Sequence, residues 1–436
     1  MHRAVPDLRL REGIHLILDA CRQPVSALEG RQLSAASCIH GKRVAMVTFS
    51  PYPEDPRPRR AAAALVNEGM TVDLICLADG KELKHLAGDR VNVLRVPVRH
   101  RRGGVLSYAY EYAAFILAAG GTLAVRSLNR RYDLVYVHNM PDILVISALV
   151  PKALGAKVIL DLHDPMPELM KTIFNLAPES TGVRFIERLE RWSIARADAV
   201  ITVNLACKRI FSTRSCRPDK ITVVMNSPDE EIFCFQKSCS AVSDPSDKRV
   251  IIMYHGSLVE RNGLDVAVDA LIQVRKSFSA AELRIFGHST PFFERVMDRV
   301  RSEGLQESVR YLGPRRLEDL VPAIQECDVG IIPNHKNAFT AINTPTRIFE
   351  YLALGKPVIV PRTPGIEDYF GPDSLVFFEP GESADLAQKI VYVASHIKAT
   401  TESARRGQQV YLEHTWSKER AALVKTVTDL LRKERP

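Results

Sequence analysis

The sequence predicts an α/β protein with two Rossmann-like, doubly wound domains that face each other across a cleft. Short apolar segments typical of buried strands alternate with stretches of helical length, which favours parallel sheets. The alternation stops in a polar segment, 236–248, and then starts again, so it predicts two sheets joined by a linker. Ligands of such sheets bind at the carboxyl ends of the strands, and we expect the site there.

The first alternation begins at Lys42 and continues to about Phe235. Its strands end in loops rich in Pro, Asn and Asp, and Gly69 stops its first helix. Strands are expected at 43–53, 70–77, 92–98, 133–139, 157–164, 198–204 and 220–226, and helices at 59–69, 105–128, 141–154 and 183–196.

The second alternation begins at Arg249, directly after the linker. Strands are expected at 249–258, 282–288, 308–314, 328–334, 357–362 and 374–380, and helices at 264–277, 291–303, 317–326, 346–354 and over 383–436. The expected domains are an extension of unknown role at 1–40 with a short apolar helical stretch at 14–21, a first domain at 41–238, a second at 245–400, and C-terminal helices at 401–436 that pack back toward the first domain.

The composition excludes several classes of protein. Of 436 residues, 46% are hydrophobic and 25% charged, which is typical of a folded globular chain and not of a disordered or collagen-like one.

The net charge of +8 favours an anionic partner, such as nucleotide phosphates or an acidic membrane, without indicating nucleic acid. The eight cysteines form no Cys-x-x-Cys pair, which predicts a reducing, cytoplasmic setting and no zinc site. Neither a secretory signal nor a spanning apolar run is evident, so a peripheral or soluble protein is expected.

A glycine turn follows the first strand of the second domain. Gly256 comes directly after the strand, Arg261 lies in the turn, and Gly263 precedes a helix. Glycines allow close approach of the backbone, amides at a helix start attract anions, and an arginine can hold a phosphate through two hydrogen bonds. The turn therefore predicts a diphosphate site, although a plain connection between strand and helix explains it as well. The pattern of an ATPase P-loop is absent.

A glutamate lies on the helix after the Asn343-Thr344-Pro345 turn. A carboxylate on the cleft side of this helix, Glu350, can accept both hydroxyls of a ribose. The alternative is a solvated surface charge, the commoner role of a helical glutamate.

Several segments together resemble the family 4 glycosyltransferases of the GT-B fold. They are IFEYLALGKPVIV, HGSLVERNG, LRIFGH, VRYLGP, ADAVITVN and ITVVMNSPDEEIF, and PEDPRPRRAAAALVNEGMTVDLIC resembles the first loop and helix of the family. The resemblance covers about residues 41–430 and implies a retaining enzyme that moves a sugar from a nucleotide diphosphate sugar to an acceptor in the cleft.

The resemblance also implies roles for individual residues. Glu350 matches the second glutamate of the Glu-x7-Glu motif, which holds the ribose, while Ile342 stands where the first glutamate is usual. The usual Arg and Lys of the phosphate turn fall at Ser257 and Asn262, so Arg261 must supply the charge. The catalytic residues implied are His163, Arg261 and Glu350, and the donor-binding residues are Gly256, Ser257, Asn262, Gly263, Gly287, His288, Thr344, Thr346 and Arg347.

Three polar residues at strand ends of the first domain are expected on the acceptor side: His138, Asp142 and Asp164. His163, which precedes Asp164, matches the position that contacts the donor sugar in the family. Core packing explains His138 equally well, and capping of the next helix is a common role for a residue such as Asp142.

The expected chemistry uses no metal and no cofactor. The sequence has no Asp-x-Asp motif for a divalent cation on the donor, so Arg261 and backbone amides must neutralise the leaving diphosphate. The resemblance also implies attack from the front face with retention, in which the leaving phosphate takes the acceptor proton and no separate base is needed. Two alternatives stay open: an inactive GT-B protein that binds nucleotide sugars, and a sugar-nucleotide 2-epimerase.

A basic cluster precedes a long apolar helix in the first domain. Arg99, Arg101 and Arg102 lie before this helix, and Arg126, Arg130 and Arg131 lie at its end. The helix is expected to pack in the core, yet flanking charge of this kind also suits the inner face of an anionic membrane and an acceptor sugar linked to lipid. The partners expected are thus a nucleotide sugar, an acceptor sugar and a peripheral membrane contact, without nucleic acid.

Overall fold

The computed structural model describes residues 38–78, 90–98, 105–238 and 249–432. Contacts divide the chain into a short unit, Met1–Cys38, and a large unit, Ile39–Pro436, that holds both sheets. The apolar stretch 14–21, the cluster Arg99, Arg101 and Arg102, and most of the expected linker lie outside the described residues.

The first sheet contains seven described strands, all parallel, in the order β3-β2-β1-β4-β5-β6-β7. The order reverses between β1 and β4, which makes their carboxyl ends the expected place for a ligand. The elements are β1 (Arg43–Pro51), α2 (Pro56–Asn67), β2 (Thr71–Leu77), β3 (Val91–Val96), α3 (Val105–Asn129), β4 (Leu134–His138), η1 (Asp142–Ala148), α4 (Leu149–Ala153), β5 (Lys157–Leu162), α5 (Met166–Phe174), α6 (Thr181–Arg196), β6 (Ala199–Thr202), α7 (Leu205–Arg214), η2 (Pro218–Lys220) and β7 (Ile221–Val223).

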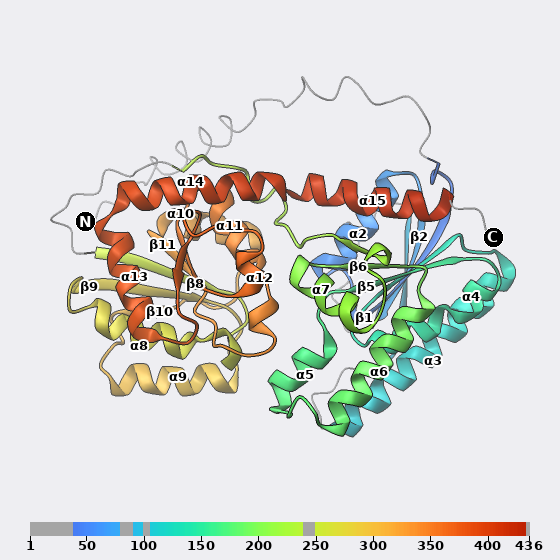
Figure 1. Ribbon diagram of the computed structural model, residues 1–436, viewed down its shortest axis with the longest axis horizontal. Coiled ribbons are helices and arrows are strands. Elements are labelled where there is room, and N and C mark those ends of the chain that lie inside the picture. Colours follow the sequence, from blue (N-terminus) through green and yellow to red (C-terminus); the bar gives the residue numbers. More distant parts are fainter. Residues whose placement is uncertain (1–37, 79–89, 99–104, 239–248, 433–436) are drawn as a thin grey trace, which may run out of the picture. The chain divides into compact units, whose positions relative to one another are not determined.

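The second sheet has the same topology, with strand order β10-β9-β8-β11-β12-β13 (Figure 1). Its elements are β8 (Arg249–His255), η3 (Glu260–Asn262), α8 (Leu264–Val274), β9 (Ala280–Phe286), α9 (Pro291–Ser302), β10 (Val309–Tyr311), α10 (Leu317–Glu326), β11 (Val329–Ile331), η4 (Thr340–Ile342), α11 (Thr346–Ala353), β12 (Val358–Pro361), α12 (Pro364–Glu367), β13 (Val376–Phe378), α13 (Ser383–Ser395), α14 (Ile397–Glu413) and α15 (Trp416–Arg432).

Each sheet is buried on both faces, as its continuous apolar strands require. In the first sheet, α3, η1, α6 and α7 cover one face, and α2 and α15 cover the other. In the second sheet, α8, α9 and α13 pack on one face, and α10, α11 and α14 on the other. The last helix therefore completes the core of the first sheet although it follows the second in sequence.

The expected fold, two doubly wound parallel sheets, is confirmed. The segment expected as one helix over 141–154 begins instead as a 3₁₀ helix, η1, and becomes α-helical only at α4. Three short α-helices were not expected: α5, α7 and α12. The N-cap of α7 is Asn204, whose side chain accepts a hydrogen bond from the Cys207 amide.

The two sheets are linked by hydrogen bonds from loops at their carboxyl ends. The Asn204 amide, which follows β6, donates to the Ile342 carbonyl at 2.9 Å and to the Thr344 hydroxyl at 3.2 Å. Next to it, Arg209 of α7 forms a bidentate ion pair with Asp368 at 2.7 and 2.8 Å. These contacts bring the carboxyl ends of both sheets together.

Candidate functional site

A buried cluster of two histidines and an aspartate lies where β4 and β5 end. Strand register places His138 opposite Asp161, and His163 follows β5. His138 Nδ1 lies 3.0 Å from His163 Nε2 and 3.4 Å from Asp161 Oδ2, and the Tyr136 hydroxyl donates to Asp161 Oδ2 at 2.8 Å. Both histidines are expected site residues, whereas Asp161 was not expected.

The charges in this cluster follow from burial and from these bonds. Burial opposes ionisation of Asp161, but His163, His138 and Tyr136 outweigh it and lower the pKa of the carboxyl well below its usual range. Burial lowers the pKa of His163 to about 3, so this ring is neutral at pH 7. The ionised carboxylate lies 3.4 Å from His138 Nδ1 and 3.7 Å from His163 Nδ1, which favours a proton on both nitrogens and lets His138 Nδ1 donate to His163 Nε2.

The same three residues have the donor types of a metal site. One ligand atom from each of His138, Asp161 and His163 lies within 4.8 Å of the others, a grouping that the sequence did not predict. At 3.0 Å the two ring nitrogens share a hydrogen bond, and an ion would have to replace it.

An asparagine organises the loop that follows β4. Asn139 donates to Asp142 Oδ1 and to the Asp164 carbonyl, both at 2.9 Å, and accepts from the His163 amide at 2.8 Å. Burial, together with nearby Glu190, raises the pKa of Asp142 to about 7. Asp142 lies in the first turn of η1, whose N-cap is Pro141, so it does not cap this helix through its side chain. The two acidic residues expected on the acceptor side thus share one partner.

The expected diphosphate turn lies between β8 and α8. Gly256 has φ +122° and Gly263 has φ +67°, and a Cβ at Gly263 would lie 1.9 Å from the Pro333 carbonyl oxygen. Asn262 holds the turn closed by donating to the Ser257 carbonyl at 2.9 Å. Only glycine fits at Gly263, because both the dihedral angle and the space exclude a side chain.

Arg261 points toward the first sheet's site. Its guanidinium lies over the Phe339 ring at 5.7 Å, and burial lowers its pKa, an effect that the nearby Asp164 carboxylate opposes. Burial likewise raises the pKa of Asp164, whereas the charges of Arg57 and Arg261 lower it. Two expected site residues from different sheets therefore interact electrostatically.

Glu350 is buried on α11 beside the end of β8. Its Oε2 lies 3.4 Å from His255 Nε2, and neither atom has a hydrogen-bond partner among the described residues. Burial raises the pKa of Glu350 to about 7 against the charges of Arg347 and Arg60, and burial together with Arg347 lowers that of His255 to about 3. The alternative of a solvated surface charge is wrong for Glu350, since only 7% of the residue is exposed.

Arg347 lies over the turn at the end of β8. It donates to the His255 carbonyl at 2.5 Å, and its guanidinium stacks on Tyr254 at 5.0 Å from the ring centre. A Cβ at Gly256 would come within 3.3 Å of the Arg347 Cδ atom. The guanidinium therefore packs against the glycine turn.

The remaining expected donor residues are placed differently. Thr344 is buried, and its hydroxyl donates to the Gly365 carbonyl at 2.7 Å while accepting from Asn204, so the link between the sheets occupies it. Ile342, at the position of the missing glutamate, packs against the core of the first sheet. Thr346 is half-buried at the start of α11, and His288 is exposed. Gly287 follows β9, and a Cβ added there would lie 2.2 Å from the Gly256 carbonyl oxygen.

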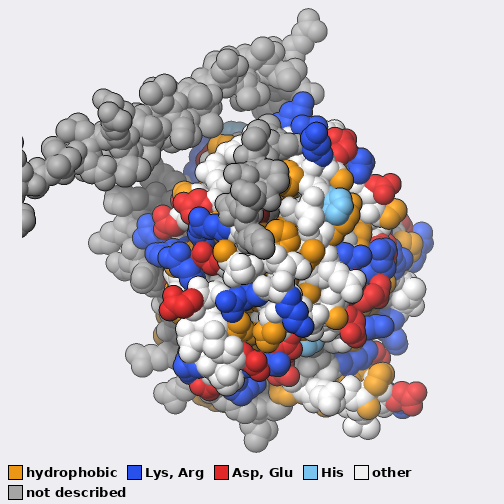
Figure 2. Space-filling view, turned by 90° about the vertical axis from the view of Figure 1, so that its left-hand side faces the viewer, with side chains coloured by type: hydrophobic (Ala, Val, Ile, Leu, Met, Phe, Trp, Pro, Cys, Tyr) orange, Lys and Arg blue, Asp and Glu red, His pale blue; other side chains and the backbone are white. Residues whose placement is uncertain are grey.

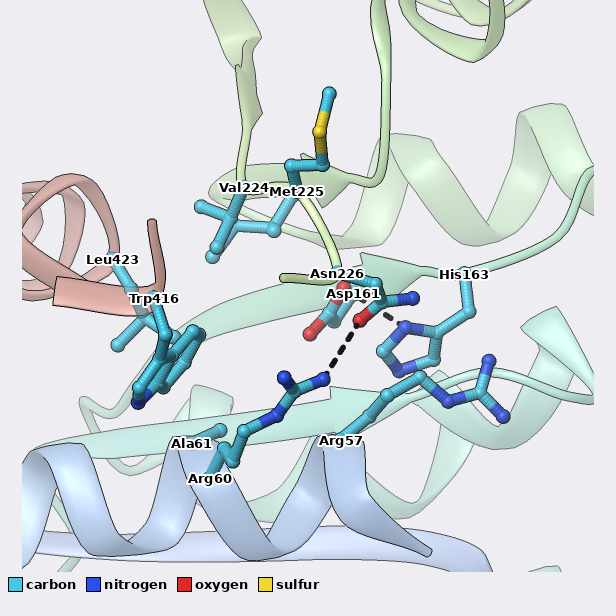
Figure 3. Close-up of a pocket in the computed structure, with 11 residues that line it drawn as sticks. Arg57, Arg60, Ala61, Asp161, His163, Val224, Met225, Asn226, Trp416 and Leu423 are labelled. Atoms are coloured by element: carbon cyan, nitrogen blue, oxygen red, sulfur yellow. Dashed lines mark hydrogen bonds and ion pairs between the residues drawn. The ribbon is translucent and has the colours of Figure 1, made fainter. Parts of the chain in front are cut away.

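A cavity beside His163 is lined by residues that the sequence did not single out. Arg57 and Arg60 come from α2, Asn226 from the loop after β7, and Trp416 from the start of α15 (Figure 3). The PRPRR segment after the first strand was the available signal for the arginines. No local pattern could have indicated Trp416, because tertiary packing alone brings it here.

Two family models match the chain, one to each sheet. Residues 55–227 match the glycosyl transferase 4-like domain, and residues 249–396 match the glycosyl transferases group 1. A probable glycosyltransferase of Pseudomonas aeruginosa, WbjE, is 22% identical over 59% of this chain and 64% of its own length. The chain thus matches less than two thirds of the length of this relative.

Solved structures share the fold at low identity. Sucrose-phosphate synthase of Thermosynechococcus elongatus has a TM-score of 0.70 at 16% identity, covering 90% of this chain and 98% of that one. HepE of Anabaena in complex with UDP-glucose has a TM-score of 0.65 at 18% identity, covering 89% and 99%.

Proposed function

Because this chain belongs to the family 4 glycosyltransferases with the GT-B fold, we propose that it is a retaining enzyme that transfers a sugar from a nucleotide diphosphate sugar to an acceptor in polysaccharide or glycolipid biosynthesis. The observation that carries this proposal is the buried Glu350 beside the glycine turn. Its unpaired Oε2 is an acceptor that lacks a donor, and the ribose hydroxyls of a nucleotide supply one. The UDP-glucose bound to HepE supports a nucleotide sugar as donor.

The turn after β8 accounts for the diphosphate. Arg261 and the amides at the start of α8 supply positive charge, and Arg347 packs against Gly256 from the side of Glu350. These two arginines replace the charge that Ser257 and Asn262 do not provide. Their guanidinium groups can hold phosphate oxygens through paired hydrogen bonds and so stabilise the leaving group.

The transfer step follows from the same geometry. The acceptor oxygen bonds to the anomeric carbon on the face from which the phosphate leaves, the carbon–phosphate oxygen bond breaks, and the acceptor proton moves to that phosphate oxygen. His163 is neutral at pH 7 and its Nδ1 faces Asp161, so it serves as an uncharged contact to the sugar rather than as a base. Retention of anomeric configuration is the stereochemical result.

A binding screen followed by product analysis tests the proposal. Sugars of UDP, GDP, ADP and CMP are compared by thermal shift, because a ligand of the native state raises the unfolding midpoint. The binding donor is then incubated with acceptor extracts, and the released nucleotide and the anomeric configuration of the product are measured. Binding without release would favour the inactive protein, and change at C2 of the sugar would favour the epimerase. An inverted product would contradict the retaining mechanism.

We further propose that the enzyme reaches a lipid-linked acceptor by docking on an anionic membrane through α3 and α6. On α3, Tyr110, Leu117, Val125 and Leu128 are 76%, 76%, 62% and 74% exposed and follow helical spacing. Both helices contact η1 on the same face of the first sheet. No helix in the described part of the chain is long and apolar enough to cross a bilayer.

The exposed side of α6 supplies the charge for this contact. Arg184, Arg188, Arg191 and Arg196 are exposed there, whereas its acidic residues, Glu187 and Glu190, lie near Arg214, at 3.9 and 2.5 Å. In contrast, the face shown in Figure 2 mixes acidic and basic side chains with scattered hydrophobic ones. Each arginine near an anionic surface contributes about 1 kcal/mol.

Vesicle sedimentation tests the membrane contact. Wild type should pellet with acidic vesicles at low salt and be released by salt, since the charges are screened over about 8 Å at physiological ionic strength. Leu117→Ser with Val125→Ser, and separately Arg188→Ser with Arg191→Ser, should each weaken pelleting, as should serine at Arg99, Arg101 and Arg102. Pelleting that is absent for wild type, or equal for all variants, would contradict this docking surface.

A further inference from the structure

The cavity beside His163 is lined by a half-buried arginine, Arg60, that forms no ion pair with a described residue. Arg60 donates to the Ser227 carbonyl and to Asn226 Oδ1, the latter at 3.4 Å, and its guanidinium lies 4.9 Å from the centre of the Trp416 ring. In the described part of the chain, no carboxylate oxygen lies within 4.0 Å of it, and Asp229 and Glu350 act on its charge only from farther away. A cation that is largely removed from water without a paired anion is costly, and a ligand can supply the missing charge.

Other groups on the cavity wall are also hydrogen-bond donors. His163 is 95% buried, and its Nδ1 forms no hydrogen bond but lies 3.7 Å from Asp161 Oδ1. Asn226 uses its oxygen to hold Arg60, and its Nδ2 has no acceptor among the described residues. Arg57, one helical turn before Arg60, is fixed by Asp55 through Nε at 3.2 Å.

Among the described residues that line the cavity, Asp161 is the one carboxylate, and it is already engaged. Asp161 accepts from Tyr136 and lies beside His138, so its oxygens are turned to the histidine cluster. Figure 3 shows Arg60 and Asn226 around the same space, with the His163 ring beside Asp161. The cavity itself is about 20 Å³, on the scale of one or two water molecules, which suits the end of a ligand and not a whole sugar.

We propose that this cavity is an oxyanion subsite, with Arg60 as its central residue, that binds a carboxylate or phosphate group carried by the sugar substrate or the acceptor. It is separate from the diphosphate turn, because its donors come from α2, β5, the loop after β7 and α15. The inference rests on the proposed transferase function and adds that one of the two substrates is anionic apart from the nucleotide.

Trp416 allows a local test, since the chain has two tryptophans. In a Trp192→Phe background, Trp416 is the sole tryptophan, and an anion that draws Arg60 from the indole should change its emission. The protein is first saturated with UDP to occupy the diphosphate turn and then titrated with inorganic phosphate, glucose 1-phosphate, glucuronate and, as the neutral control, glucose. We expect the anions to change the emission and glucose not to do so.

Variants of Arg60 decide the assignment. Arg60→Gln should weaken the anion response about tenfold or more, and Arg60→Lys should weaken it less, since lysine retains the charge but loses the planar fork. Arg217→Gln is the matched control, because 85% of its side chain is exposed. The emission of each variant with anion is compared with the emission of the same variant without ligand. If Arg60→Gln does not fold, Asn226→Ala is tested in its place.

The outcomes separate this inference from the proposed function. A stronger response to glucuronate indicates a carboxylate on the sugar, and a stronger response to glucose 1-phosphate indicates a phosphate on the acceptor. Emission that no anion changes, or an Arg60→Gln response equal to that of Arg217→Gln, overturns the subsite. Failure to bind any nucleotide sugar counts against the transferase instead, and the titrations without UDP still test the subsite.

Discussion

Replacing Glu350 by glutamine should remove a pH dependence from both stability and nucleotide binding. Burial raises the pKa of this carboxyl from an ordinary 4.5 to about 7, although Arg347 and Arg60 act against the rise. At 1.36 kcal/mol per unit, the difference corresponds to roughly 3 kcal/mol. The folded state therefore binds the proton more tightly than the unfolded state between about pH 4.5 and 7.

The sign of the effect follows from this order of the two pKa values. The protonated carboxyl stabilises the fold fully below about pH 4.5, and this contribution is lost as the pH rises through 7. Glu350→Gln stays neutral throughout, so relative to wild type it should gain stability on going from pH 5 to pH 8, by up to about 3 kcal/mol. Thermal unfolding of both proteins at each pH measures this gain.

Nucleotide binding should depend on pH in the opposite direction. The ribose hydroxyls donate to an ionised carboxylate, so binding must remove the proton, and wild type should bind UDP about tenfold more weakly at pH 6 than at pH 8. Calorimetry in buffers of different ionisation enthalpy measures both the affinity and the released proton. Glu350→Gln should bind weakly at every pH and serves as control for titration of the nucleotide itself. Equal pH dependence of wild type and variant would refute the assignment of Glu350 to the ribose.

Three further substitutions test the site. Gly263→Ala should cost more than about 1 kcal/mol, because its Cβ would meet the Pro333 carbonyl at a positive φ, whereas Gly371→Ala, with open space around it, should cost little in the same unfolding assay. Asp142→Asn should stabilise the fold at pH 8 but not at pH 5, because burial raises the pKa of Asp142 to about 7 and asparagine keeps the Oδ1 acceptor for Asn139. Unfolding midpoints equal to those of wild type at both pH values would contradict this. Arg261→Ala should lower UDP affinity in calorimetry more than Arg261→Lys, and wild-type affinity in both would exclude a phosphate role.

Both sheets could be predicted from the sequence because most strands are short apolar runs followed by a turn and a helix. That pattern depends on local burial and on the preference for right-handed crossovers, both of which are visible in one segment at a time. Helix α7 was missed, since its start depends on the Asn204 cap and its sequence has little apolar periodicity. For 141–154, periodicity indicated a helix but could not distinguish a 3₁₀ turn from an α-helical one.

The site was predictable where its residues stand at strand ends and not where packing brings distant segments together. Position alone singled out His163 and Gly256, because parallel strands end at one edge of a sheet. The cavity, in contrast, joins Arg60 to Trp416, more than 300 positions later in the chain. Similarly, only the structure shows that Thr344 is occupied by Asn204.

The path of the last helix has a consequence for how this chain is made. Helix α15 contributes Leu423, Val427 and Leu430 to the core that covers one face of the first sheet, and it contacts α2 and β7 (Figure 1). During synthesis the strands of the first sheet leave the ribosome some 200 residues before this helix, so one of their apolar faces waits uncovered while the second sheet is translated. A fragment that stops before Trp416 would keep that face exposed and should aggregate, and the first sheet expressed alone would need α15 supplied as a separate peptide.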